Sequence, residues 1–121
     1  MGAMPRGRPE SINAVTVGVT DMTASCAFYG ALGFETVHGG ADSPFTSYGV
    51  GPTFLNLQLV ESVETAWGRF IVHVDDVDAM HERAVTAGLR PTMLPSDAPW
   101  GERYFHIADP DGHEVSFARR L

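Results

Sequence analysis

Two tryptophans and a set of polar side chains are the residues of this 121-residue chain best suited to hold a small molecule. Indole rings stack on flat or conjugated ligands, and their faces also attract cations. The polar side chains can donate or accept hydrogen bonds, as the few polar groups of small-molecule sites usually do. We therefore predict a ligand site composed of Trp67, Trp100, Asn56, Gln58, Arg69, His73, Tyr104, His106, Glu114 and Ser116.

Several of these side chains also have simpler structural interpretations. Trp67 or Trp100 could close the end of a sheet or form a contact between two copies of the chain. Arg69 could pair with Glu114, or it could hold an anionic or carbonyl oxygen of a ligand. Acid–base catalysis is a further alternative, because it needs a titratable group within hydrogen-bond reach of a reacting atom. The candidates for that role are His106, Tyr104 and Glu114.

An internal repeat indicates which elements position these residues. A shift of 55 positions superposes two strand-like segments, residues 15–19 and 70–74. The same shift superposes two aspartates that suit helix N-caps and two glycines that suit left-handed helix ends. These pairs are Asp21 with Asp76 and Gly33 with Gly88. Each copy therefore predicts a strand, a helix and a glycine stop.

Both strand-like segments alternate between an apolar face and a mixed face. The apolar residues are Val15, Val17 and Val19 in the first copy and Phe70, Val72 and Val74 in the second. We expect these apolar faces to pack beneath the helices. The mixed faces should then line a cavity.

Three further strands are expected after each helix. They cover residues 35–39, 45–50 and 53–60 in the first half, and 90–94, 103–107 and 114–118 in the second. Turn signals at 51–52 and 109–112 precede the last strand of each half. The prediction is an α+β fold of two tandem βαβββ modules, residues 11–62 and 63–121, within one domain. Residues 1–10 are expected to be a flexible start or the remnant of a tag.

Three motifs in this order resemble the glyoxalase/bleomycin resistance/extradiol dioxygenase (vicinal oxygen chelate) superfamily. They are Phe28-Tyr-Gly-Ala-Leu-Gly-Phe34, Val74-Asp-Asp-Val-Asp78 and Asp109-Pro-Asp-Gly112, and the resemblance covers residues 11–119. It implies a curved mixed sheet around a cleft, completed in a homodimer. It also implies, for most enzymes of the family, a divalent metal held by His, Gln or Glu side chains on the first and last strands of each module.

The residues at the implied metal positions cannot provide the usual ligands. They are Ala14, Asn56 (or Gln58, one strand step away), Arg69 and Ser116. Alanine has no donor atom, protonated arginine repels a cation, and neutral Asn and Ser are poor ligands for zinc or nickel. We therefore predict no metal and no cofactor. A relocated set of His73, His106 and Glu114 stays open as an alternative, since two histidines and a carboxylate can hold iron.

Metal-free members of this family include proteins that sequester bleomycin and related antibiotics. The segment Pro99-Trp-Gly-Glu-Arg-Tyr-Phe105 is similar to the corresponding segment of those proteins. The resemblance thus implies a metal-independent binding protein for a small molecule, such as a planar or cationic antibiotic. The alternative is a glyoxalase-like lyase or isomerase, or another enzyme that uses acid–base residues or a relocated metal.

Composition limits the other classes of function. The net charge of −7 repels phosphate backbones and argues against nucleic acid as a partner. No apolar run approaches the roughly 20 residues that cross a bilayer, and the start lacks the apolar stretch of a secretory signal. The single cysteine, Cys26, allows no intrachain disulfide, which favours a cytoplasmic protein. His113, after a turn, is expected at the surface.

Overall fold

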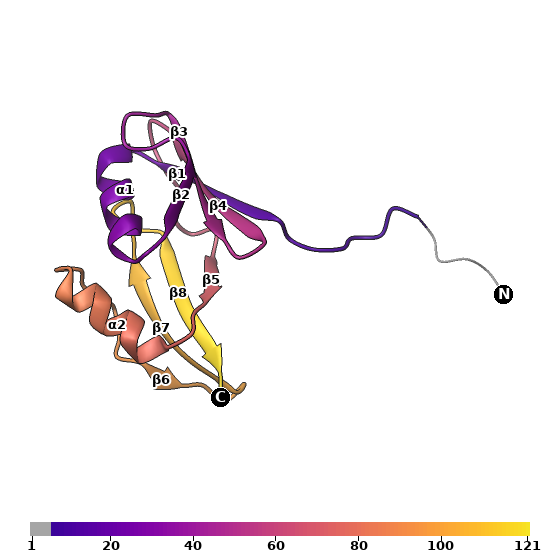
Figure 1. The fold of residues 1–121 in the computed structure, drawn as a ribbon, viewed down its shortest axis with the longest axis vertical. Coiled ribbons are helices and arrows are strands. Elements are labelled where there is room, and N and C mark those ends of the chain that lie inside the picture. Colours follow the sequence, from indigo (N-terminus) through magenta and orange to yellow (C-terminus); the bar gives the residue numbers. More distant parts are fainter. Residues whose placement is uncertain (1–5) are drawn as a thin grey trace.

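The computed structural model describes residues 6–121 as two four-stranded mixed sheets, each with one helix (Figure 1). The first module contains β1 (Ala14–Val19), α1 (Met22–Ala31), β2 (Glu35–His38), β3 (Phe45–Val50) and β4 (Thr53–Leu59). The second contains β5 (Arg69–His73), α2 (Val77–Thr86), β6 (Ser96–Asp97), β7 (Glu102–Ala108) and β8 (Glu114–Arg120). The predicted α+β fold of two tandem βαβββ modules is confirmed.

The two sheets have the same topology. Their strand orders are β1-β4-β3-β2 and β5-β8-β7-β6, and the first and last strands of each module pair in parallel. The other neighbouring strands pair antiparallel. The mixed faces of the first and last strands therefore lie side by side in each sheet.

Both helices begin and end where the sequence indicates. The carboxylates of Asp21 and Asp76 accept the amides of Ala24 and Ala79, each at 3.0 Å, which satisfies N–H groups of the first turn. Two glycines follow the helix ends with left-handed backbones, at φ values of 90° and 82°. These glycines are Gly33 and Gly88, and their conformation stops each helix at little steric cost.

The core lies between the helices and the apolar faces of the sheets. Val17, Val19 and Phe70 are buried there, as predicted, together with Phe105 and Phe117 from β7 and β8. Because the side chains of a strand alternate, burial of Phe105 turns its neighbours to the opposite, open face of the sheet.

One predicted strand is wrong. Residues 90–94 form no strand, and the edge of the second sheet is the two-residue β6. Pro91 and Pro95 lack the amide hydrogen that a ladder needs. Thr92, between them, bonds the His106 carbonyl through both its amide and its hydroxyl, at 2.9 and 3.0 Å. The prolines on both sides of Thr92 therefore leave residues 90–94 bonded to β7 only at the His106 carbonyl, and the strand edge is the short β6.

The turn between β7 and β8 joins the two modules. Its buried Asp109 accepts the Tyr29 hydroxyl of α1 at 2.8 Å, and also accepts two amides of its own turn. Asp111 accepts the amide of Thr20 at 3.1 Å and its hydroxyl at 2.5 Å, at the end of β1. We call these contacts, with those of His113, the turn lock. Burial and the nearby Asp109 carboxylate raise the pKa of Tyr29, so the phenol remains a donor.

His113 lies inside this lock, so its predicted surface position is wrong. The ring is 2% exposed, with Nδ1 at 3.0 Å from the Trp67 indole nitrogen and Nε2 at 2.7 Å from the Gly18 carbonyl. An indole nitrogen can only donate a hydrogen bond, so Nδ1 accepts one from Trp67. Nε2 then carries the proton and donates a hydrogen bond to the Gly18 carbonyl. The neutral imidazole thereby links β1, the segment between the modules, and β8.

The segment before β1 is exposed over residues 6–13 and belongs to no helix or strand. The rest of the predicted flexible start, residues 1–5, lies outside the described residues. Within residues 6–121, neither helix has the length and apolarity needed to cross a membrane.

The turn lock predicts a specific loss of stability. Tyr29→Phe leaves one oxygen of buried Asp109 without its donor, which should cost about 1–3 kcal/mol of unfolding free energy. Urea unfolding of the two proteins measures this difference. Tyr104→Phe, on the open face of β7, is the matched control and should stay within about 0.5 kcal/mol of the parent. Equal effects of the two substitutions would contradict the lock.

Two buried hydroxyls, one in α1 and one in β3, should affect stability in opposite directions. The hydroxyl of Ser25 is buried without a hydrogen-bond partner, whereas that of Thr46 bonds both the amide and the carbonyl of Gly40 at 3.0 Å. Ser25→Ala should therefore stabilise the fold by about 1 kcal/mol, through relieved desolvation and better helix propensity. Thr46→Val should destabilise it by about 1–3 kcal/mol. Thermal and urea unfolding provide the measurement.

Candidate functional site

Most of the predicted site residues lie together on the open face of the second sheet. Asn56 and Gln58 lie on the first sheet instead, and Trp67 lies in the link between the modules, bonded to His113. The group on or beside the second sheet comprises Arg69, His73, Trp100, Tyr104, His106, Glu114 and Ser116.

Three aromatic rings lie in a row beside β7. The Trp100 ring lies 5.5 Å from that of Tyr104, and the Tyr104 ring lies 5.0 Å from that of His106, centroid to centroid. Tyr104 and His106 are two residues apart on one strand, so they point to the same face. The successive rings are tilted by 35° and 53°, and we call this row of rings the aromatic ladder. Trp100 remains 67% exposed and offers its ring to solvent.

The loop that carries Trp100 is held from both ends. Backbone bonds from Ala98 to Glu102 and from Gly101 to Ala98, at 2.7 and 3.0 Å, close a tight turn. The Arg103 guanidinium bonds Asp78 of α2 and Asp97 of β6, each at 2.9 Å. These carboxylates raise the pKa of Arg103, so the guanidinium stays charged. The indole is therefore presented on a fixed turn.

Glu102 is a member of the site that the sequence analysis missed. Its carboxylate accepts the Trp100 indole N–H at 3.0 Å and lies 3.0 Å from Nε2 of His73 on β5. It occurs two residues before Tyr104, so the alternation of β7 could have placed it on the same face. Glu102 thus fixes the indole and adds a carboxylate beside the ladder.

A further ion pair lies across β5 and β8. Arg69 and Glu114 are register partners on these parallel strands, and the Arg69 Nε donates to the Glu114 carboxylate. The expected pairing of the two side chains is therefore present. Both remain partly exposed, so the pair is worth little as a stabilising contact but can exchange partners with a ligand.

His106 connects the ladder to β8. Its Nδ1 lies 2.5 Å from the hydroxyl oxygen of Ser116, which is buried. Burial lowers the pKa of His106 below its ordinary value, while the Glu114 carboxylate raises it and the Arg69 guanidinium lowers it. A lowered pKa favours the neutral ring at pH 7, which can accept a proton or a hydrogen bond.

The polar residues of the first sheet form a separate chain of hydrogen bonds. The Ser47 hydroxyl donates to the Asn56 amide oxygen at 2.7 Å, and the Asn56 amide nitrogen donates to the Thr16 hydroxyl at 3.2 Å. Gln58 follows on the same face of β4 and is exposed. These groups offer amides and hydroxyls but no charge.

The residues at the family's metal positions do not fit a divalent cation. Arg69 brings a positive charge and is already paired with Glu114, and the Ser116 hydroxyl is engaged with His106. Asn56 uses both of its amide atoms within the first sheet. Over residues 6–121, no group of three or more His, Cys, Asp or Glu side chains is placed to hold a metal ion.

Comparison with known proteins identifies the family of this fold. The family model described as Glyoxalase/Bleomycin resistance protein/Dioxygenase superfamily matches residues 11–117. An uncharacterized protein of Mycobacterium bovis is 44% identical over 46 residues, which are 38% of this chain and 30% of that protein. The match thus spans less than a third of that relative.

Solved structures extend the likeness to nearly the whole chain. A lactoylglutathione lyase from Agrobacterium tumefaciens is 23% identical, with a TM-score of 0.76 over 91% of this chain and 93% of that one. A bleomycin-binding protein in complex with bleomycin is 19% identical, with a TM-score of 0.74 over 93% of this chain and 100% of that one. At these identities the likeness establishes the fold alone.

The charges around His106 predict the direction of its titration. Its pKa, followed by NMR of the ring protons, should lie below the ordinary value of about 6.5. Glu114→Gln should lower this pKa further and Arg69→Gln should raise it, since each removes one opposing charge. Shifts in the opposite directions would contradict the placement of the two side chains.

The same shift makes stability depend on pH. The folded state binds a proton on His106 less readily than the unfolded chain does. The contribution of His106 to stability is therefore complete above about pH 6.5 and falls as pH drops from there toward the folded-state pKa. In His106→Gln, the urea midpoint of unfolding should therefore change less with pH over that interval than it does in the parent protein.

Proposed function

Because the chain belongs to the Glyoxalase/Bleomycin resistance protein/Dioxygenase superfamily, we propose that it binds and sequesters a small organic molecule without the help of a metal ion. The observation that carries this proposal is the aromatic ladder of Trp100, Tyr104 and His106 on an open sheet face. The exposed ring of Trp100 at one end of this row can stack on a flat ligand, and the indole face adds attraction for a cation.

The charges beside the ladder favour a planar cation. Glu102 and Glu114 lie on the ladder face and contact the side chains of His73 and Arg69. More than half of each of these two side chains is exposed to solvent. A cationic ligand can replace His73 or Arg69 as the partner of these carboxylates. The net charge of −7 also favours the approach of a positively charged molecule. The fold also resembles that of a bleomycin-binding protein, so an antibiotic is the class of ligand that we propose.

A homodimer is the second part of the proposal. The ladder lies on an open face, whereas small-molecule sites usually bury most of their ligand. The predicted ligand residues Asn56 and Gln58 lie on the other sheet of the same chain. A second copy whose first sheet faces the ladder would join the two groups of predicted residues in one cleft and would produce two such clefts per dimer.

An enzyme is the alternative, and one contact favours it. His106, with its lowered pKa, lies 2.5 Å from Ser116 and next to Tyr104, so an acid–base pair is available on the ladder face. A lyase or isomerase acting on a substrate such as lactoylglutathione, the compound named in one structural neighbour, would use these groups.

Calorimetric titration with metal-free bleomycin and with the planar cation acriflavine tests the binding proposal. At least one probe should bind, and Trp100→Ala should weaken its affinity by about tenfold through loss of the stack. Leu94→Ala, which removes an exposed apolar side chain outside the ladder, is the matched control and should leave affinity unchanged. Binding of neither probe, or equal losses in both variants, would contradict the proposal.

Recovery of the ligand separates binding from catalysis. After denaturation of the complex, mass spectrometry should return bleomycin unaltered. Turnover of S-lactoylglutathione that is lost in His106→Gln would instead establish the enzyme, and sensitivity of that turnover to a chelator would indicate a relocated metal.

A further inference from the structure

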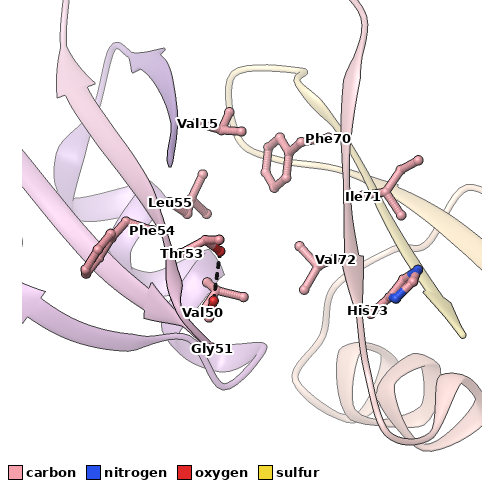
Figure 2. Close-up of a pocket in the computed structure, with 10 residues that line it drawn as sticks. All are labelled: Val15, Val50, Gly51, Thr53, Phe54, Leu55, Phe70, Ile71, Val72 and His73. Carbon is pink, nitrogen blue, oxygen red and sulfur yellow. Dashed lines mark hydrogen bonds between the residues drawn. The ribbon is translucent and has the colours of Figure 1, made fainter. Parts of the chain in front are cut away.

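A cleft of about 340 Å³ lies at the seam between the two modules (Figure 2). One wall comes from β1 and from the hairpin of β3 and β4, and the other comes from β5. None of its lining residues belongs to the aromatic ladder or to the turn lock, although His73, which lies 3.0 Å from Glu102 beside the ladder, also borders the cleft. Its volume falls within the range of about 300–1,000 Å³ that is usual for ligand pockets.

The side chains that point into this cleft are apolar. Val15 and Leu55 extend from the first module toward Phe70 and Val72 of the second, while Ile71 and His73 of β5 point away (Figure 2). Alternation along β5 explains this division, because residues 70 and 72 share the face opposite to residues 71 and 73. The imidazole of His73 is therefore turned out of the space between the two walls.

The hydroxyl among the lining side chains is already satisfied. The hydroxyl of Thr53 donates to the Val50 carbonyl at 2.8 Å, within its own hairpin. A water molecule needs two to four polar partners to be held well, so an apolar cleft of this kind holds water weakly. An apolar solute that displaces this water gains the free energy of burying hydrocarbon surface.

The internal repeat explains why the seam is open at this place. Residues 51–52 form the turn before the last strand of the first module, where the second module has the turn of residues 109–113. Asp109, Asp111 and His113 of the second turn bond the first module. Gly51 and Pro52 have no side-chain group that could bond the second module in the same way. One of the two equivalent joints is thus polar and closed, and the other is apolar and open.

The opening continues beyond the first cleft. A smaller hollow of about 150 Å³ shares Val50 and Val72 with it and extends to Phe34, Met80 and Phe117. The apolar surface therefore runs along the seam toward α2. An engineered apolar cavity of about 150 Å³ holds benzene, so the larger cleft has room for roughly two fused rings or a branched chain of similar size.

We propose that the seam cleft binds a small uncharged apolar molecule of roughly ten carbon atoms, at a site separate from the aromatic ladder. Val15, Val50, Leu55, Phe70 and Val72 form its contact surface. A carboxylate analogue should bind more weakly, because a carboxylate buried against these side chains would lose its hydration without gaining a partner among them. This site goes beyond the proposed ladder function and does not depend on it.

Methyl NMR with naphthalene tests the proposal on the full chain. Naphthalene should shift the methyl resonances of Val15, Val50, Leu55 and Val72, while Val85, exposed on α2, should stay unchanged. Val72→Phe fills the cleft and should weaken naphthalene binding at least about tenfold. Val50→Phe, at the other wall, is the second filling variant, and Val85→Phe is the matched control that should bind as the parent does.

Two further arms separate this site from the ladder and define its chemistry. Trp100→Ala should retain the seam shifts in full, even where it loses bleomycin or acriflavine. 1-Naphthoate should bind at least about tenfold more weakly than naphthalene, because its carboxylate must be desolvated. Absence of seam shifts, shifts that survive in a folded filling variant, loss of the shifts in Trp100→Ala, or equal binding of the carboxylate would each overturn the inference.

Discussion

The turn between β7 and β8 is the constraint on which the arrangement of this protein depends. Each module has one four-stranded sheet and one short helix, and the buried residues of both modules form a single core cluster. Asp109, Asp111 and His113 bond α1, the end of β1 and the carbonyl of Gly18, so they fix the second module on the first. A buried carboxylate and a buried imidazole tolerate little displacement, because each loses its partner if the modules slide. Short apolar elements alone would not define the angle between the sheets so closely.

With the modules fixed, alternation along the strands decides what each face presents. Burial of Phe105 and Ile107 in the core leaves Glu102, Tyr104 and His106 on the other side of β7. The same strand thus contributes to the core and supports the ladder, and any slip of register by one residue would exchange the two roles. Trp100 lies outside the strand, yet the bonds of Arg103 to Asp78 and Asp97 tie its loop to the same framework.

The sequence was sufficient for the architecture, because the repeat, the capping aspartates and the strand alternation are local signals. The placement of Tyr104 and His106 on the open face of β7 came instead from the family resemblance, because Phe105 and Ile107 would make an equally plausible core face on local pattern alone. The pairing of Arg69 with Glu114 was one of two alternatives that the sequence left open. The sequence failed where distant residues decide: His113 looks like a surface residue after a turn until Trp67 and Gly18 enclose it. Residues 90–94 have a strand-like composition, but Pro91 and Pro95 remove the donors that pairing requires. Glu102 was missed because its place in the site depends on its contacts with His73 and the Trp100 indole, which only the folded arrangement shows.

The two joints between the modules have an implication for the history of the chain. Two identical modules related by a twofold axis would meet at two identical joints, so a sequence change at one would always be copied at the other. A tandem duplication within a single chain removes that coupling. Here one copy of the turn carries two acids and a histidine, while the other is reduced to Gly51 and Pro52. The fusion of the modules thereby allowed one joint to specialise in cohesion and left the other free to diverge.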